Sequence, residues 1–234
     1  MAAPPPANSA LSRRGLLAGA TALTLGGCGS AVPVFGDAAT TVRNLVLGPP
    51  ETPIPRATVA TLPYATITAK VGDLPRGLMG LVRIDGVNLH WASSNRVSVV
   101  TRRGRLIKTV GLPQDLRDMR VVGEDPIAAA PHQLMQPASY VRQLDLAHPD
   151  YFELLVDSEL TLIGPRKITI LEIEFDTILL NERNSARTLR WRFENQFWVD
   201  PVDGFVWKSA QHIGRDIPAL NIEVAKPPAP TAKS

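Results

Sequence analysis

Residues 151–180 read YFELLVDSELTLIGPRKITILEIEFDTILL, and apolar and polar side chains alternate along most of this stretch. A period of two is typical of a β-strand with one face in a core and the other in water. The segment Gly164-Pro165-Arg166 interrupts the alternation with residues that favour a turn. We therefore expect two long antiparallel strands, 151–164 and 167–180, joined at that turn.

The same period, broken by frequent turn residues, continues through the region from 58 to 225. Asp85-Gly86 and Arg103-Gly104 are typical of tight turns between paired strands. We expect one short helix within 111–122 and a loop over 124–138. About ten strands in a single antiparallel meander predict a mainly β fold, either a barrel or an open half-barrel, with at most one or two short helices.

One strand pairing can be predicted in more detail, because the segments LEIEFD and LRWRFE both alternate apolar and charged residues. A hairpin centred near Arg183 would place Glu174 opposite Arg192 and Asp176 opposite Arg190, with both apolar sets on the other face. Cross-strand pairs of opposite charge contribute about 0.2–1 kcal/mol each. Their main effect would be to fix the register of the two strands.

The first 27 residues have the organisation of a signal peptide. Arg13 and Arg14 supply positive charge, and the largely apolar run from Gly15 to Leu25 follows. That run is too short to span a bilayer comfortably. The segment SRRGLL also resembles the twin-arginine export signal. Export by the general secretory route and export by the twin-arginine route both remain open.

The only cysteine, Cys28, follows this segment in the sequence LGGC, which resembles a bacterial lipobox. We expect cleavage before Cys28, a thioether to diacylglycerol and an acyl chain such as palmitate on the freed amine, which together anchor the protein to the membrane. The alternatives are a buried free cysteine or ordinary signal cleavage nearby. Because Gly29 stands where aspartate would favour the inner membrane, the default location is the periplasmic face of the outer membrane. Residues 28–57 would form a flexible tether, and the Pro-rich residues 226–234 a disordered tail.

Composition excludes several classes of function. The chain has 25 basic and 22 acidic residues, and two of the basic ones lie in the signal peptide, so the mature protein is near neutral and is not predicted to bind nucleic acid. A single cysteine allows no internal disulfide and no cysteine-based metal site. The four histidines are scattered, and no nucleotide-binding or hydrolase motif appears. We therefore predict no cofactor and no metal.

Two groups of charged residues are candidates for chemistry or binding. The row Glu172, Glu174 and Asp176 has a spacing compatible with the paired carboxylates of a glycosidase, although a solvated face paired with arginines is the simpler interpretation. A basic hairpin could contact an anionic polysaccharide or lipid headgroups, or could guard a sheet edge against aggregation. Its residues are Arg102, Arg103, Arg105 and Lys108. Of the four tryptophans, Trp191 is predicted to lie in the core because of its place in the alternation.

Three stretches together resemble the YjbF/GfcB family of bacterial lipoproteins, associated with group 4 capsule and exopolysaccharide production. They are LPYA at 62–65, WASSNRVSVVTRRGRLIKTVGLP at 91–113 and FENQFWVDPVDGFVWKSAQHIG at 193–214. The resemblance runs from about residue 58 to residue 224. It implies an outer-membrane lipoprotein with a mostly β, barrel-like domain that acts beside polysaccharide export components, and it carries over no catalytic residues. The hairpin FWVDPVDGFVWKS is also similar to that of half-barrel lipoprotein carriers of the LolA type.

These observations favour a non-enzymatic accessory lipoprotein. It would bind polysaccharide or act as a scaffold for export proteins, with the membrane as a further partner through its lipid anchor. The first alternative is a polysaccharide-modifying enzyme that uses the Glu172, Glu174 and Asp176 row. The second is a carrier of a lipid or lipid-linked intermediate, which requires a sizeable apolar cavity inside the barrel.

Overall fold

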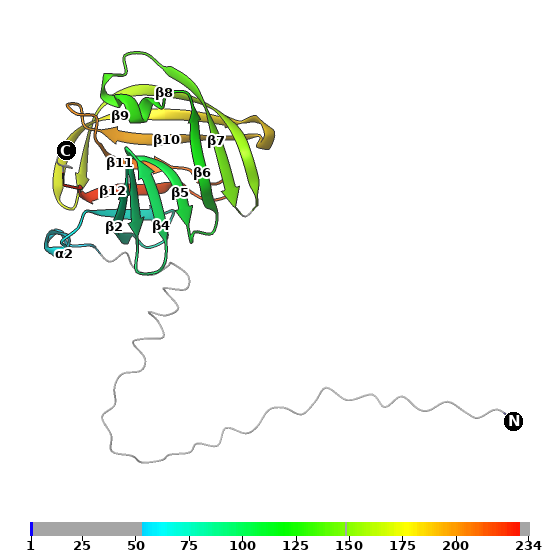
Figure 1. Ribbon diagram of the computed structural model, residues 1–234, viewed down its shortest axis with the longest axis horizontal. Coiled ribbons are helices and arrows are strands. Elements are labelled where there is room, and N and C mark those ends of the chain that lie inside the picture. The colour runs from blue at the N-terminus through cyan, green and yellow to red at the C-terminus, as the bar shows by residue number, and fades with distance from the viewer. Residues whose placement is uncertain (2–52, 148, 230–234) are drawn as a thin grey trace, which may run out of the picture. The chain divides into compact units, whose positions relative to one another are not determined.

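The structure, a computed structural model, describes Met1, residues 53–147 and residues 149–229. In this part of the chain twelve strands form one antiparallel sheet (Figure 1). The strands are β1 (Thr66–Val71), β2 (Gly77–Asp85), β3 (Asn88–Ala92), β4 (Ser98–Arg102), β5 (Arg105–Val110), β6 (Asp115–Val122), β7 (Ala138–Ala147), β8 (Tyr151–Ile170), β9 (Ile173–Ala186), β10 (Trp191–Val199), β11 (Val206–Gln211) and β12 (Leu220–Lys226).

The sheet curls into a nearly closed barrel, and this confirms the predicted fold class. Each strand pairs with its neighbour in sequence, except that β1 pairs with β12 and β5 and β6 are the two ends of the strand order. Side chains join these two ends. The Thr109 hydroxyl donates to Asp115 Oδ1 over 2.9 Å and accepts from the amide of Leu116, also over 2.9 Å. The first and last strands, β1 and β12, are therefore paired neighbours within the sheet. The two edges of the sheet, β5 and β6, come from the middle of the chain.

The described residues include two short α-helices, α2 (Arg56–Thr61) and α3 (Pro126–Ala129), and two 3₁₀ turns, η1 (Pro131–Gln133) and η2 (Arg187–Leu189). The helix predicted within 111–122 is wrong, because this segment forms strand β6. Its two most buried apolar residues, Leu116 and Met119, are three positions apart, which imitates helical spacing. A β-bulge between Leu116 and Asp118 shifts the alternation by one residue and brings both side chains to the core.

The turn between the two long strands also lies elsewhere than predicted. Gly164, Pro165 and Arg166 are inside β8, paired with residues of β9 next to a bulge. The turn consists of Leu171 and Glu172, with φ values of 44° and 71°. A two-residue turn with both central residues at positive φ usually contains glycine or asparagine, so Leu171 and Glu172 do not indicate a turn.

The predicted hairpin centred near Arg183 is wrong as well. Arg192 lies opposite Ser185, and Glu174 lies opposite Thr169 of β8. The chain reverses at η2 instead, where Arg190 adopts the left-handed conformation. The polar run 181–185 looked like a turn because polar residues usually face water. It is a central strand segment in which three polar residues, Asn181, Glu182 and Asn184, are buried.

The barrel interior combines two apolar clusters with buried polar side chains. The larger cluster includes Ile67, Trp91 and Trp191, which confirms the core position predicted for Trp191. The smaller one includes Leu160, Phe197 and Val206. No helix in the described part of the chain is long and apolar enough to cross a membrane.

Candidate functional site

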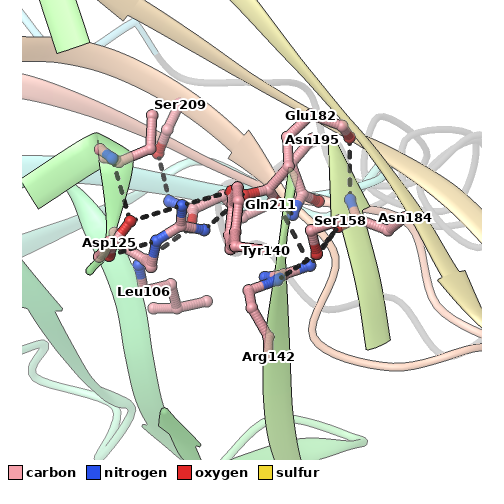
Figure 2. A network of polar contacts seen from close by, with 12 residues as sticks. Leu106, Asp125, Tyr140, Arg142, Ser158, Glu182, Asn184, Asn195, Ser209 and Gln211 are labelled. Atoms are coloured by element: carbon pink, nitrogen blue, oxygen red, sulfur yellow. Dashed lines mark hydrogen bonds and ion pairs between the residues drawn. The ribbon is translucent and has the colours of Figure 1, made fainter. Parts of the chain in front are cut away.

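A carboxylate at the centre of the barrel, Glu182 on β9, organises the buried polar side chains (Figure 2). Its side chain is fully buried. Oε1 accepts a hydrogen bond from Arg105 Nη1 over 2.7 Å and another from the Tyr140 hydroxyl. Oε2 accepts from Asn195 Nδ2 over 2.6 Å and lies 3.2 Å from Arg142 Nη2. Strands β5, β7, β9 and β10 thus meet at one carboxylate.

Arg105 connects this carboxylate to the segment after β6. Its Nε and Nη2 donate to the two oxygens of Asp125 over 2.7 and 2.9 Å, a bidentate arrangement. Asp125 is also the N-cap of α3, where Oδ1 accepts from the amide of Ile127 over 3.0 Å. The position of α3 therefore depends on an arginine that is itself fully buried.

A second set of polar contacts surrounds Arg142. Its Nε donates to Ser158 Oγ over 3.0 Å and its Nη2 donates to Asn184 Oδ1 over 2.6 Å. These bonds link β7, β8 and β9 below the outer surface of the sheet. Because buried polar groups with matched partners hold one geometry, they fix the register of these strands.

Burial and charge act in opposite directions on these groups. Burial alone would raise the pKa of Glu182, but the charges of Arg105 and Arg142 outweigh it and lower that pKa from 4.5 to about 2. Burial lowers the pKa of Arg142, and it raises the pKa of the Tyr140 hydroxyl above its usual range. Glu182 is therefore ionised at neutral pH and paired with two cations, so it holds the interior together rather than acting as a proton donor.

The four residues of the predicted basic hairpin separate in the structure. Arg105 cannot contact a polymer or headgroup at the surface, because its side chain is entirely inside the barrel. Arg102 donates to Asn88 Oδ1 over 2.9 Å on the neighbouring strand. Arg103 and Lys108 are exposed. For these last three residues, contact with polymer or headgroups stays a prediction.

A groove of about 930 Å³ runs over the outer surface of β7, β8, β9 and β10. The strand register places Asp157, Ser185 and Arg192 side by side in one row across it. The adjacent row places Glu159 next to Arg183, and Arg183 next to Glu194. The groove is thus lined by alternating carboxylate, hydroxyl and guanidinium groups.

Some of these side chains are paired and others are available. Arg187 donates to Asp157 over 2.8 Å, and Arg183 lies 3.7 Å from Glu194. In the part of the chain that the structure describes, the side chains of Arg192 and Glu159 have no hydrogen-bond or ion-pair partner, and both are exposed. A ligand in the groove would meet a cation and an anion on neighbouring rows.

The carboxylate row predicted as a possible enzyme site lies at the far end of the β8–β9 hairpin. Glu174 and Asp176 both contact Lys167, at 2.5 and 3.2 Å, and their side chains are 62% and 80% exposed. Glu172 lies in the turn itself. These carboxylates therefore lie on a solvated face and are paired with a cation, as the simpler interpretation of the row expected. The cation is a lysine of β8 rather than an arginine of β10.

A separate cavity of about 400 Å³ lies between the β4–β5 turn, the α3–η1 segment and strands β11 and β12. The β4–β5 turn approaches β11 so closely that a Cβ at Gly104 would lie 2.3 Å from Val206 Cβ. Gly104 also has a φ of 86°, which side chains other than glycine rarely adopt. The turn can take this position only with glycine there.

Among the described residues, no group of three or more histidine, cysteine or acidic side chains is placed to hold a metal ion. Cys28, Arg13 and Arg14 lie outside the described residues, as do the limits of the signal peptide and most of the tether. Lipidation at Cys28 and the export signal therefore stay predictions.

Sequence reasoning did not find Glu182, Tyr140, Arg142 or Asp125 as parts of a site. One signal was available for Glu182. In the second half of β9 the alternate positions Leu180, Glu182, Asn184 and Ala186 are each at most 4% exposed, so Glu182 continues a buried set that begins with an apolar residue. A carboxylate in the apolar phase of a strand indicates a buried ion pair, since an isolated buried charge is too costly.

Comparisons with known proteins agree with one another. The family model described as "Group 4 capsule polysaccharide lipoprotein gfcB, YjbF" matches residues 39–224. The chain is similar to the uncharacterized lipoprotein GfcB of Escherichia coli K12, with 26% identity over 72% of this chain and 79% of the relative. It is also similar to the uncharacterized lipoprotein YjbF of the same strain, with 22% identity over 83% of this chain and 89% of the relative.

A solved structure has the same fold. The crystal structure of the hypothetical lipoprotein YmcC from Escherichia coli K12 aligns with a TM-score of 0.68 and 23% sequence identity. The alignment covers 86% of this chain and 99% of that one. The mainly β, barrel-like architecture is therefore shared with a lipoprotein.

Proposed function

The chain belongs to the family of group 4 capsule polysaccharide lipoproteins, YjbF, and from this premise we propose that it is a lipid-anchored accessory protein of capsule or exopolysaccharide production or export. It acts by binding the polymer in the groove over β7–β10, and not by catalysis. Its curated relatives are lipoproteins, which implies a place in the cell envelope.

The groove is the observation that carries this proposal. Its volume of about 930 Å³ is at the upper end of the range for small-ligand sites, and it is open to solvent over four strands. Adjacent strands are about 4.8 Å apart, so the row Glu159, Arg183 and Glu194 alternates carboxylate and guanidinium groups at intervals suited to the hydroxyls of consecutive sugars. Guanidinium and carboxylate groups form the stronger, charge-assisted hydrogen bonds.

The network inside the barrel supports binding without a large change of shape. Tyr140, Ser158 and Asn184 also line the groove, at positions that alternate with its exposed charged residues, and they are bonded to the Glu182 network below. A binding surface on strands of fixed register is already in its binding geometry. Such preorganisation reduces the entropy lost on association.

The anchor is the second part of the proposal. Two or more acyl chains at Cys28 would hold the protein on the periplasmic face of the outer membrane after export by the general secretory or twin-arginine route. Metabolic labelling with an alkyne analogue of palmitate tests it. The wild-type protein should be labelled and the Cys28→Ser variant should not; equal labelling of both would contradict the anchor at Cys28.

The binding step is tested with the extracellular polysaccharide purified from the bacterium that makes this protein. The mature lipoprotein in detergent is immobilised, and polymer binding is measured by interferometry. Loss of both unpaired groove charges, in Arg192→Gln with Glu159→Gln, should weaken binding about 30-fold, since exchanging a charged hydrogen bond for a neutral one loses about 1 kcal/mol at each of the two positions. Arg166→Gln, an exposed arginine on β8 outside the groove, is the matched control and should bind as wild type.

Two results would contradict the proposal. One is the absence of polymer binding by the folded wild-type lipoprotein. The other is equal binding by the groove double variant and the wild type. Both substituted side chains are exposed, so the double variant should fold as the wild type does. An unchanged circular dichroism spectrum would show that its loss of binding does not come from unfolding.

A further inference from the structure

The cavity beside the β4–β5 turn has the size and lining of a ligand site, and the proposed groove does not use it. Its volume is about 400 Å³, within the 300–1,000 Å³ typical of small-ligand pockets. Its apolar wall includes Ile67, Trp91, Val206 and Ile222 from β1, β3, β11 and β12, each at most 6% exposed. The cavity therefore opens directly onto the hydrophobic core.

Four polar side chains in the cavity wall are already bonded to the protein. Thr101 Oγ1 accepts from the indole of Trp91 over 2.9 Å, and Ser209 Oγ accepts from Gln211 over 2.9 Å. Asp203 accepts from the amide of Phe205 over 2.8 Å, and Lys208 pairs with Glu223 over 2.8 Å. A guest is offered few hydrogen bonds and mostly apolar surface, which suits a hydrocarbon chain better than a sugar.

One charged residue of the lining differs from these. Arg103 is exposed in the turn that borders the cavity, and its side chain has no ion pair or hydrogen bond within the described part of the chain. Its φ of 47° is in the left-handed region, and it precedes Gly104 in the turn. A guanidinium is well suited to bind a phosphate through two parallel hydrogen bonds.

We propose that this cavity binds the alkyl chain of a lipid that carries a phosphate headgroup, with the chain against the apolar wall and the phosphate at Arg103. The unpaired guanidinium of Arg103 favours an anionic lipid over the protein's own predicted anchor, because a thioether-linked diacylglycerol carries no charge. The site is distinct from the groove over β7–β10 and does not depend on the proposed function.

The test uses the full chain with Cys28→Ser, so that no attached acyl chain competes for the cavity. Binding of dodecyl phosphate is measured by titration calorimetry below its micelle concentration. Dodecyl maltoside serves as a probe with the same chain and a neutral headgroup, and inorganic phosphate as a probe without a chain. Dodecyl phosphate should bind best with one molecule per chain, dodecyl maltoside more weakly, and inorganic phosphate not detectably.

Two variants separate the contributions of the chain and the headgroup. Ala128→Trp fills the cavity from α3 and should weaken both alkyl probes about tenfold or more. Arg103→Asn keeps a residue that tolerates the left-handed turn and should weaken only dodecyl phosphate, by about three- to fivefold. Arg96→Asn is the matched control, because Arg96 is also an exposed arginine at positive φ, in the β3–β4 turn outside the cavity.

Each contrary outcome overturns the proposal. These are no binding of either alkyl probe, undiminished binding by a folded Ala128→Trp variant, or the same loss in Arg96→Asn as in Arg103→Asn. If Ala128→Trp does not fold, Val87→Trp fills the same cavity from an exposed position. Binding of maltose as tight as that of dodecyl maltoside would show a sugar site instead.

Discussion

Strand β9 carries two clusters of oppositely charged side chains. The distances between the charged atoms are similar in the two clusters, but the exposure of the side chains is very different. At one end of the strand Glu174 lies 2.5 Å from Lys167, with both side chains more than 60% exposed. Eight residues further along, Glu182 lies 2.7 Å from Arg105, with both side chains fully buried. Bulk water screens the first pair, whereas burial shields the second pair from bulk solvent. The separation of two charges therefore does not indicate what the pair contributes to stability.

The two clusters also have different partners and different consequences. The exposed cluster joins only the two strands of one hairpin, β8 and β9. The buried cluster joins β5, at one end of the strand order, to β7, β9 and β10 in the other half of the sheet, and through Asp125 it also fixes α3. Removing one partner from the buried cluster should therefore affect the whole barrel.

The largest effect is expected from Glu182→Gln. The substitution leaves Arg105 and Arg142 without their shared carboxylate, and breaking a buried pair costs about 3–5 kcal/mol. Urea unfolding should show that decrease in the free energy of unfolding. Glu194→Gln, on the neighbouring strand and largely exposed, is the control and should have little effect. If both variants lost the same stability, burial would not be what distinguishes the two clusters.

The pH dependence of the free energy of unfolding also tests the contribution of the buried Glu182 cluster. In the wild type this cluster stays intact at neutral pH. The pKa of Glu182 falls from 4.5 to about 2 on folding, so its contribution is complete above pH 4.5 and is lost as the pH falls toward 2. Over that window the wild type should lose about 3 kcal/mol more than Glu182→Gln. Parallel curves for the two proteins would show that Glu182 is not the group that titrates.

An intermediate effect is expected at Asp125, whose side chain is 12% exposed. Asp125→Asn keeps the N-cap of α3 but removes the charge facing Arg105, which should cost about 2 kcal/mol. Asp125→Ala removes the cap too and should cost about 1 kcal/mol more. Thermal unfolding of both variants measures the two steps. Equal values for Asn and Ala would mean that the cap contributes nothing to stability.

The smallest effect is expected at Lys167. Its hydrogen bonds to Glu174 and Asp176 raise its pKa, but the whole cluster is in water. Lys167→Gln should leave the thermal midpoint unchanged within the error of calorimetry, at low and at high salt. A drop comparable to that of Asp125→Asn would contradict the contrast between exposed and buried pairs.

Much of the fold could be predicted from the alternation of apolar and polar residues. That pattern identified a mainly β barrel or half-barrel and the core position of Trp191, because side chains on a strand point alternately to two faces. The Arg103-Gly104 turn was identified by its glycine. The strand ends were less predictable. The turn at Leu171-Glu172 contains no glycine, and the bulge in β6 shifts the alternation by one residue.

The candidate sites were less accessible to sequence reasoning. Arg105 appeared as one of four surface cations in RRGRLIK, and Glu182 as part of a polar turn. Only the closed sheet places these residues, 77 positions apart in the chain, within 2.7 Å of each other. The groove likewise depends on the register of four strands, and a shift of one residue would turn its charged rows to the opposite face.

The sequence by itself determined the local features of this protein. It set the strand period, the near-neutral charge of the domain, and the basic, apolar and cysteine-containing order at the N-terminus that predicts a lipid anchor. These are properties of neighbouring residues. The tertiary structure alone decided which charges are buried, where the groove and the cavity lie, and that β1 meets β12. Those depend on contacts between residues far apart in the chain, and their energies are set by burial, which local sequence does not specify.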